Sequence, residues 1–159
     1  MPKLTQVKET KRGRYALFFD GEFAFSLDED TFAMAGLHTG DELEEWQIHD
    51  LQTKSDTRKA VDKAMDLLAL RDHAAGELYQ KLCRSFDPHS AAAAVAKMQE
   101  LNLLDDAGFA RRRAAELLRK RKSRRAILDD LHAKGIDRDA AAEAVEALFA
   151  QSEEDEEEN

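Results

Sequence analysis

The chain has 159 residues, of which 43% are hydrophobic and 36% charged, so it can bury the core of one or two small domains and no more. Its formal net charge is −9, and its single cysteine, Cys83, excludes an intramolecular disulfide and favours a reducing compartment. The N-terminus has no apolar signal segment and no apolar run approaches the roughly 18 residues that span a bilayer, so we expect a soluble, cytoplasmic protein that does not enter a membrane.

Strand and turn signals are confined to the N-terminal third of the chain. Apolar side chains alternate with other residues on both sides of Asp20-Gly21, where glycine supplies the positive φ that a tight hairpin turn requires. We therefore predict a β-hairpin centred on this dipeptide, with a third strand at Leu4–Lys8. A short helix is expected over Leu27–Ala35, because Gly36 occupies the position of a left-handed helix stop.

From Thr57 to Phe149 the strand signals disappear, and the helix-forming residues Ala, Leu, Glu, Lys and Arg dominate. The apolar spacing predicts three helices, at about Thr57–Leu70, Ala74–Arg84 and His89–Leu101. Asp87 followed by Pro88 is typical of an N-cap and a first helical residue, and so marks the start of the third helix.

This three-helix pattern is then repeated. Leu67, Leu68 and Arg71 recur about fifty residues later as Leu117, Leu118 and Arg121, and the helix cap Asp87 recurs as Asp137. A repeat of this length predicts two tandem three-helix modules, neither of which can bury its apolar face fully alone. The fold class is therefore expected to be mainly α and elongated, behind a small β-containing region.

The predicted organisation has four parts. They are a β-containing region at residues 1–52, a first three-helix module at 57–102, a second at 103–150, and a tail at 151–159. The tail, QSEEDEEEN, carries six acidic residues and no hydrophobic residue, so we expect it to be disordered.

Residues 111–125 invert the sign of the charge. This segment, RRRAAELLRKRKSRR, contains nine Lys or Arg and one Glu in a chain that is otherwise acidic. A phosphodiester backbone attracts such a segment, because bound cations release the counterions of the polymer. The alternative is a solvated, Arg-rich helix face without a partner, since charge runs on helices are common.

Motifs for catalysis and for metal binding are missing from the sequence. It contains no Gly-rich phosphate loop, no nucleophile elbow and no helical HExxH. The spacing of the soft ligands His73, Cys83, His89 and His132 fits no zinc signature. We therefore expect a protein that is not an enzyme and that binds neither a metal nor a cofactor.

Three segments of the helical part resemble the RecX family, the bacterial regulators of the RecA recombinase. They are LLALRDHAAGELYQKL, LLDDAGFARR and ILDDLHAKGI. The β-containing extension of RecX proteins from Gram-positive bacteria is similar to two further segments, RYALFFDGEFAF and LHTGDELEEW. The resemblance covers nearly all of residues 1–149, although family members usually carry a third three-helix module and the pattern here provides two.

The resemblance implies a non-enzymatic regulator of homologous recombination and DNA repair in the SOS response, which binds the RecA–DNA filament and modulates RecA activity, with inhibition as the expected direction. It implies an elongated monomer that lies in the filament groove and contacts both protein and DNA. The basic residues expected to meet DNA phosphate or an acidic RecA surface are Arg111, Arg112, Arg119, Lys120, Arg121, Lys122, Arg124 and Arg125.

Two other functions remain open. The chain could be a nucleic-acid-binding helical module that acts without RecA, and its binding would then be independent of sequence, because no recognition helix with base-reading Asn or Gln is present. It could also be an adaptor whose basic face docks acidic proteins.

Some residues of the RecX-like motifs have expected structural roles. Asp105 and Asp106 can cap the helix that carries Phe109, because acidic side chains are favourable at a helix N-terminus. Glu77 can pair with Lys81 one helical turn away, so its role is expected to be local.

Overall fold

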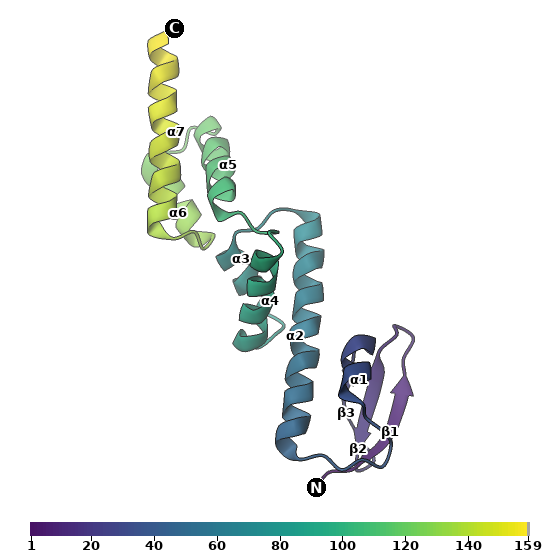
Figure 1. The fold of residues 1–159 in the computed structure, drawn as a ribbon. Helices are drawn as coiled ribbons and strands as arrows, with labels where there is room; N and C mark the ends of the chain where they lie inside the picture. The colour runs from purple at the N-terminus through teal and green to yellow at the C-terminus, as the bar shows by residue number, and fades with distance from the viewer. Residues whose placement is uncertain (159) are drawn as a thin grey trace.

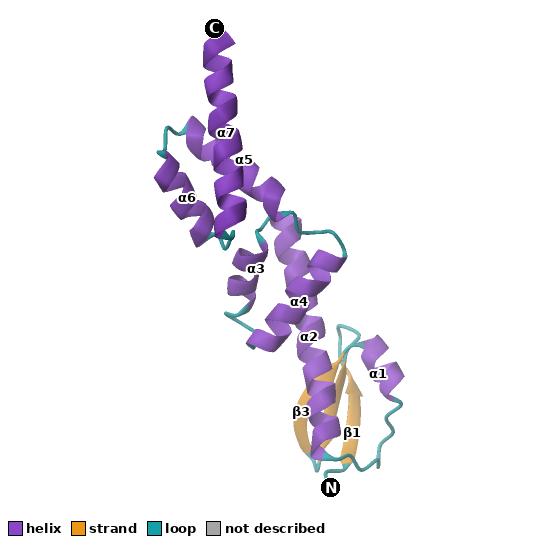
Figure 2. Cartoon of the chain, turned by 60° about the vertical axis from the view of Figure 1, so that its left-hand side comes forward, coloured by secondary structure: helices purple, strands orange, loops and turns teal. Residues whose placement is uncertain are grey.

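The computed structural model describes residues 1–158, which form an elongated body with a small sheet at one end and the last helix at the other (Figure 1). Two groups of three helices follow the sheet along the long axis, and Figure 2 shows the same succession from another side. The expected architecture, mainly α with tandem three-helix modules behind a small β-containing region, is confirmed.

The N-terminal region is a three-stranded antiparallel sheet covered by one short helix. The strands are β1 (Leu4–Glu9), β2 (Tyr15–Phe19) and β3 (Glu22–Leu27), in the order β1-β2-β3. Asp20 and Gly21 turn the hairpin with φ values of 51° and 83°. Helix α1 (Glu29–Ala35) ends at Gly36, whose φ of 61° is left-handed. The predicted hairpin, third strand and helix stop are therefore confirmed.

Helix α2 (Glu45–Leu70) is continuous over 26 residues, so the predicted helix start at Thr57 is wrong. The helix begins at Glu44 with a capping box, and neither Gly nor Pro interrupts it. Residues 52–56 are polar in sequence, yet Ser55 is buried. Its hydroxyl is satisfied there, because it donates a hydrogen bond to the carbonyl oxygen of Ser26 in β3. The first half of α2 thus packs on the sheet, and its second half belongs to the first module.

The two modules have the same order of helices. The first consists of the second half of α2, α3 (Ala75–Leu82) and α4 (Pro88–Glu100), and the second of α5 (Asp106–Arg119), α6 (Arg124–Ala133) and α7 (Arg138–Glu158). The side chain of Asp87 accepts a hydrogen bond from Ser90 N in α4, and that of Asp137 accepts one from Ala140 N in α7. Both predicted caps are therefore present, and each fixes the start of the last helix of its module.

Buried side chains form three hydrophobic clusters along the molecule. The first includes Leu4, Leu17 and Leu27 under the sheet, the second Ala60, Leu78, Leu82 and Met98 in the first module, and the third Ile127, Leu131, Ile136 and Val145 in the second. Ala74, which precedes α3 in the first module, is fully buried in the third cluster. The cores are therefore separate, but the second module uses a residue of the first.

The C-terminal segment differs from the expected disordered tail at residues 151–159. Helix α7 continues to Glu158, beyond the module that it belongs to (Figure 1). Glutamate is a good helix former, and the sequence from Ala140 to Glu158 contains no Gly or Pro to end the helix. Asn159, the last residue of the predicted tail, lies outside the described residues.

The two modules meet backbone to backbone at a pair of glycines. A Cβ added to Gly76, near the start of α3, would lie 2.7 Å from the Cα of Gly135, which follows α6. A Cβ on Gly135 would likewise lie 2.6 Å from the Cα of Gly76, and the φ of Gly135 is +85°. Only glycine at both positions permits this approach.

Replacing Gly76 with Ala tests this contact through the sign of its effect. In an unobstructed helix Gly→Ala stabilises by about 0.5 to 1 kcal/mol, whereas here the added methyl group should lower the free energy of unfolding by about 1 to 3 kcal/mol. Chemical denaturation measures the difference. Gly36→Ala is the comparison. Its φ of +61° is unfavourable for alanine, but nothing lies within 4 Å of the added Cβ, so this variant reports the backbone effect without a steric clash. A more stable Gly76→Ala variant would contradict the close approach.

Candidate nucleic-acid interface

The predicted basic residues lie on α5, in the α5–α6 turn and at the start of α6. All eight are exposed: Arg111, Arg112, Arg119, Lys120, Arg121, Lys122, Arg124 and Arg125. The opposite side of α5 buries the expected apolar stripe, which includes Phe109, Ala110, Ala114 and Leu117. Six of the eight gather around the turn, whereas Arg111 and Arg112 lie about 10 Å away along the axis of α5, toward the first module.

The α5–α6 turn is closed by backbone hydrogen bonds. Arg121 N donates to Leu118 O at 2.8 Å and Lys122 N donates to Leu117 O at 3.0 Å. Arg121 has a φ of 61°, which is unfavourable for a residue other than glycine by about 1 kcal/mol or more. Ser123 then caps α6, because its hydroxyl accepts from Ala126 N at 3.1 Å. The basic turn is therefore a defined structure and not a loose loop.

Three of the eight basic residues have an intramolecular partner and five have none in the described part of the chain. Arg112 pairs with Asp72 at 3.2 Å and Lys120 pairs with Glu116 at 3.4 Å. The guanidinium of Arg124 lies 4.9 Å from the ring centroid of Phe149 in α7. Among residues 1–154, whose side chains the structure describes, no ion pair involves the remaining five, which are Arg111, Arg119, Arg121, Lys122 and Arg125. These five are exposed and are the strongest candidates for binding phosphate.

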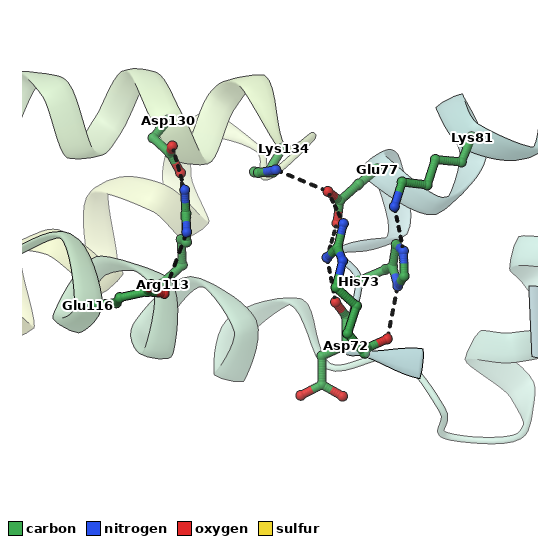
Figure 3. A network of polar contacts seen from close by, with 9 residues as sticks. Asp72, His73, Glu77, Lys81, Arg113, Glu116, Asp130 and Lys134 are labelled. Carbon is green, nitrogen blue, oxygen red and sulfur yellow. Dashed lines mark hydrogen bonds and ion pairs between the residues drawn. The ribbon is translucent and has the colours of Figure 1, made fainter. Parts of the chain in front are cut away.

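Arg113, the remaining arginine of the basic run, has a structural role. Its Nε and Nη2 donate to the two carboxylate oxygens of Asp130 in α6 at 2.9 and 3.0 Å, and Nη1 donates to Glu116 (Figure 3). These hydrogen bonds hold the pKa of Asp130 below its usual range. Arg113 therefore ties α5 to α6 and positions the turn between them.

Glu77 joins the two modules, and its predicted local pairing with Lys81 is wrong. Its carboxylate, 7% exposed, accepts hydrogen bonds from Arg71 at 2.9 and 3.1 Å and from Lys134, at the end of α6, at 3.2 Å. Burial raises the pKa of Glu77, but the hydrogen bonds from Arg71 and Lys134 outweigh burial and lower it to about 2. The helical spacing from Glu77 to Lys81 did not reveal that Arg71 and Lys134, which lie outside α3, would bind the Glu77 carboxylate in place of Lys81.

Lys81 instead contacts His73, which is buried in the same junction (Figure 3). Lys81 Nζ lies 2.9 Å from Nε2 of the ring, and because an ammonium group only donates, Nε2 must accept. Nδ1 then carries the proton and donates to Arg71 O at 3.0 Å. Burial lowers the pKa of His73, so the ring is held neutral and fixes the backbone of Arg71.

One more hydrogen bond crosses the junction, and a second one caps α5. Ala75 N donates to Asp106 Oδ1 at 2.8 Å, so Asp106 caps α3 of the first module while Asp105 caps its own helix through Gly108 N at 3.0 Å. The predicted cap of the helix with Phe109 is confirmed for Asp105. The role of Asp106 was missed, because no local spacing links it to a residue 31 positions earlier.

The soft ligands do not assemble into a metal site. Among residues 1–154, whose side chains the structure describes, no three or more His, Cys, Asp or Glu side chains are grouped so that they could hold a metal ion. His73 is buried at the junction, Cys83 is half-buried, and His89 and His132 are exposed. In the same part of the chain, no helix combines the length and the apolar character required to cross a membrane.

Acid titration of the folded protein tests the buried carboxylate. Because its pKa is about 2 in the fold and 4.5 as a free group, Glu77 stabilises the fold above pH 4.5 by about 3 kcal/mol, and this contribution is lost as the pH falls from 4.5 toward 2. Glu77→Gln should lower the free energy of unfolding at pH 7 by about 2 to 3 kcal/mol, with the difference from the parent shrinking in acid.

Urea denaturation at a series of pH values measures this difference. Glu116→Gln is the matched control: it removes a carboxylate that is 45% exposed and pairs with Arg113 and Lys120 at the surface, so its effect should stay below about 1 kcal/mol. Equal effects of the two variants would contradict a buried clamp at Glu77.

Comparison with known proteins gives a consistent family. The family model described as "RecX, second three-helix domain" matches residues 105–145, the region of the basic turn. The chain is 30% identical to regulatory protein RecX of Bacillus velezensis over 93% of this chain and 58% of that protein. It is 27% identical to regulatory protein RecX of Caldanaerobacter subterraneus subsp. tengcongensis over 90% of this chain and 73% of that protein.

Further comparisons extend over most of the chain. Regulatory protein RecX of Lactobacillus delbrueckii subsp. bulgaricus is 36% identical over 87% of this chain and 52% of its own length. A crystal structure of regulatory protein RecX has a similar fold, with a TM-score of 0.67 and 24% identity over 93% of this chain and 74% of that one. The chain spans between about half and three quarters of the length of these relatives. In sequence and in fold, the chain is therefore similar to regulatory protein RecX over most of its own length.

Proposed function

We propose that this chain is a non-enzymatic regulator of homologous recombination and DNA repair, which binds the RecA–DNA filament and inhibits RecA activity. Its relatives are named regulatory proteins, which supports a RecX-type regulatory role. In this proposal it acts as a monomer in the cytoplasm, as part of the SOS response.

The group of cations without intramolecular partners around the α5–α6 turn carries the proposal. Arg119, Arg121, Lys122 and Arg125 are exposed and lie outside the ion pairs of the described residues, on the module that the family model matches. Cations that already have carboxylate partners must break those contacts to bind phosphate, whereas these need not. Each phosphate contact that they make releases counterions and strengthens binding at low salt.

The left-handed conformation of Arg121 supports the same surface. Glycine would relieve the unfavourable φ of 61° but would remove a cation from the turn. Strained backbone is often retained where a side chain has a function. The exposed guanidinium at this position therefore fits a contact with an anionic partner.

The overall shape also suits a filament partner. The modules extend along one axis, so the molecule presents a long surface to a polymer (Figures 1 and 2). The turn lies toward the C-terminal end of this axis, and its basic residues are exposed.

The triple variant Arg121→Ala, Lys122→Ala, Arg125→Ala should weaken binding to RecA–DNA filaments. It should also lower the slope of log affinity against log salt concentration by about 2, since each phosphate contact contributes about 0.7 to 0.9. Arg124 is kept because its contact with Phe149 contributes to packing. Fluorescence anisotropy over a salt series measures both quantities.

The control removes three cations elsewhere, with Lys8→Ala, Lys54→Ala and Lys97→Ala. All three lysines are exposed and outside the basic turn, so net charge changes equally in the two triples. If both triples weaken binding to the same degree, the effect comes from net charge and the assignment to the turn fails.

The single-stranded-DNA-dependent ATPase of RecA distinguishes this function from a nucleic-acid-binding module that acts without RecA. We expect the purified chain to suppress the ATPase at less than one molecule per RecA subunit. No suppression, together with salt-sensitive binding to free DNA, would favour the second function. Binding to free RecA without DNA would favour an adaptor for acidic proteins.

A further inference from the structure

A second cationic surface lies between the sheet and the helical modules, where the β1–β2 loop faces the middle of α2. The two elements line a surface hollow of about 570 Å³, within the usual size of a ligand site of about 300 to 1,000 Å³. Five basic side chains line it, namely Arg12, Arg14, Arg58, Lys59 and Lys63, with the three acids Asp28, Asp62 and Asp66. This excess of positive charge contrasts with the whole chain, at −9.

The loop that forms one side of the hollow is held in place. Thr10 N donates to Arg14 O at 2.8 Å and Gly13 N donates to Thr10 O at 3.2 Å, which closes the loop between the strands. Arg14 also donates to Ser26 O at 3.0 Å and to the hydroxyl of Ser55 in α2 at 3.1 Å. Arg14 therefore anchors the sheet to α2 and leaves the exposed Arg12 at the tip of the loop.

The acids neutralise only part of this charge. Arg58 pairs with Asp28 at 3.7 Å and with Asp62 at 3.4 Å, so two of the three acids share this one arginine. In the described part of the chain, Arg12, Lys59 and Lys63 form no ion pair, and Asp66 is the acid that remains beside them. Three exposed cations from two separate elements thus converge on one hollow.

We propose that this hollow binds the phosphodiester backbone of nucleic acid, through Arg12, Lys59 and Lys63. Phosphate oxygens accept charge-assisted hydrogen bonds from Arg and Lys side chains, and the release of counterions from the nucleic acid makes the contact favourable. The hollow and the α5–α6 turn are separate surfaces, because the hollow is lined by the β1–β2 loop and α2, whereas the turn belongs to the second module. The proposal concerns free nucleic acid and does not depend on an action on RecA.

The double variant Lys59→Ala, Lys63→Ala tests the proposal in the full chain. Both lysines are exposed on a helix, where alanine preserves the fold. The probes are a labelled oligothymidylate and a labelled duplex of the same length, so the two arms distinguish single-stranded from double-stranded DNA as the source of the phosphates. We expect weaker binding in at least one arm, with the salt slope lowered by about 1 to 2.

The control is Lys54→Ala, Lys97→Ala, which removes the same charge from two exposed lysines that lie outside the hollow and pair with Asp50 and Glu100. A smaller effect of this control supports the site. Equal effects of the two doubles, or no effect of Lys59→Ala, Lys63→Ala on either probe, overturn it.

Lysine acetylation followed by mass spectrometry gives a readout that does not depend on affinity. Bound oligothymidylate or duplex should protect Lys59 and Lys63 from acetylation while Lys54 and Lys97 stay reactive. Unprotected Lys59 and Lys63 at saturating DNA would overturn the proposal. The RecA ATPase does not enter these measurements, so this proposal and the proposed function can fail separately.

Discussion

The carboxylate of Glu77 lies nearly buried between Arg71 of the first module and Lys134 of the second, beside the contact of Gly76 with Gly135. A charge in this position is unfavourable unless its hydrogen bonds are satisfied, and here both cations satisfy it. The absence of a Cβ on either glycine lets the backbones approach closely enough for Lys134 to reach the carboxylate. The orientation of the second module, and hence the position of its basic turn, depends on this junction.

Arginine and lysine side chains are paired with carboxylates in and beside the junction, whereas three at the basic turn are exposed and unpaired within the described part of the chain. At the junction, Arg71 and Lys134 share Glu77, and within the second module Arg113 binds Asp130, so these cations have carboxylate partners in the fold. At the turn, Arg121, Lys122 and Arg125 are exposed and have no ion-pair partner among residues 1–154, whose side chains the structure describes. Arginine content alone therefore does not locate a binding surface in this chain. The pairing of each arginine with the surrounding carboxylates does, because a paired guanidinium must exchange partners before it binds phosphate.

Continuity of α2 has a similar effect on the N-terminal region. One helix packs against the sheet through Leu51 and Ser55 and against the first module through Ala60 and Ala64. The sheet is thus attached to a rigid element of the helical body, since a helix without Gly or Pro resists bending. This attachment places the β1–β2 loop beside Lys59 and Lys63, and a flexible linker at residues 52–57 would not hold them together.

Local sequence determined those features whose causes lie within a few residues. The Asp20-Gly21 hairpin, the caps Asp87, Asp105 and Asp137 and the stop at Gly36 follow from side chains that act on their own backbone, and the buried stripe of α5 follows from its helical spacing. The exposure of Arg111, Arg112 and Arg119 followed from that stripe as well. Tertiary structure alone decided the partners of Glu77, the cap from Asp106 to Ala75 and the pairing of Arg113, because residues that are distant in sequence meet there. It also decided the unbroken α2, whose first half packs on the sheet with Ser55 buried against β3, a contact that the helical spacing from Thr57 onward did not reveal.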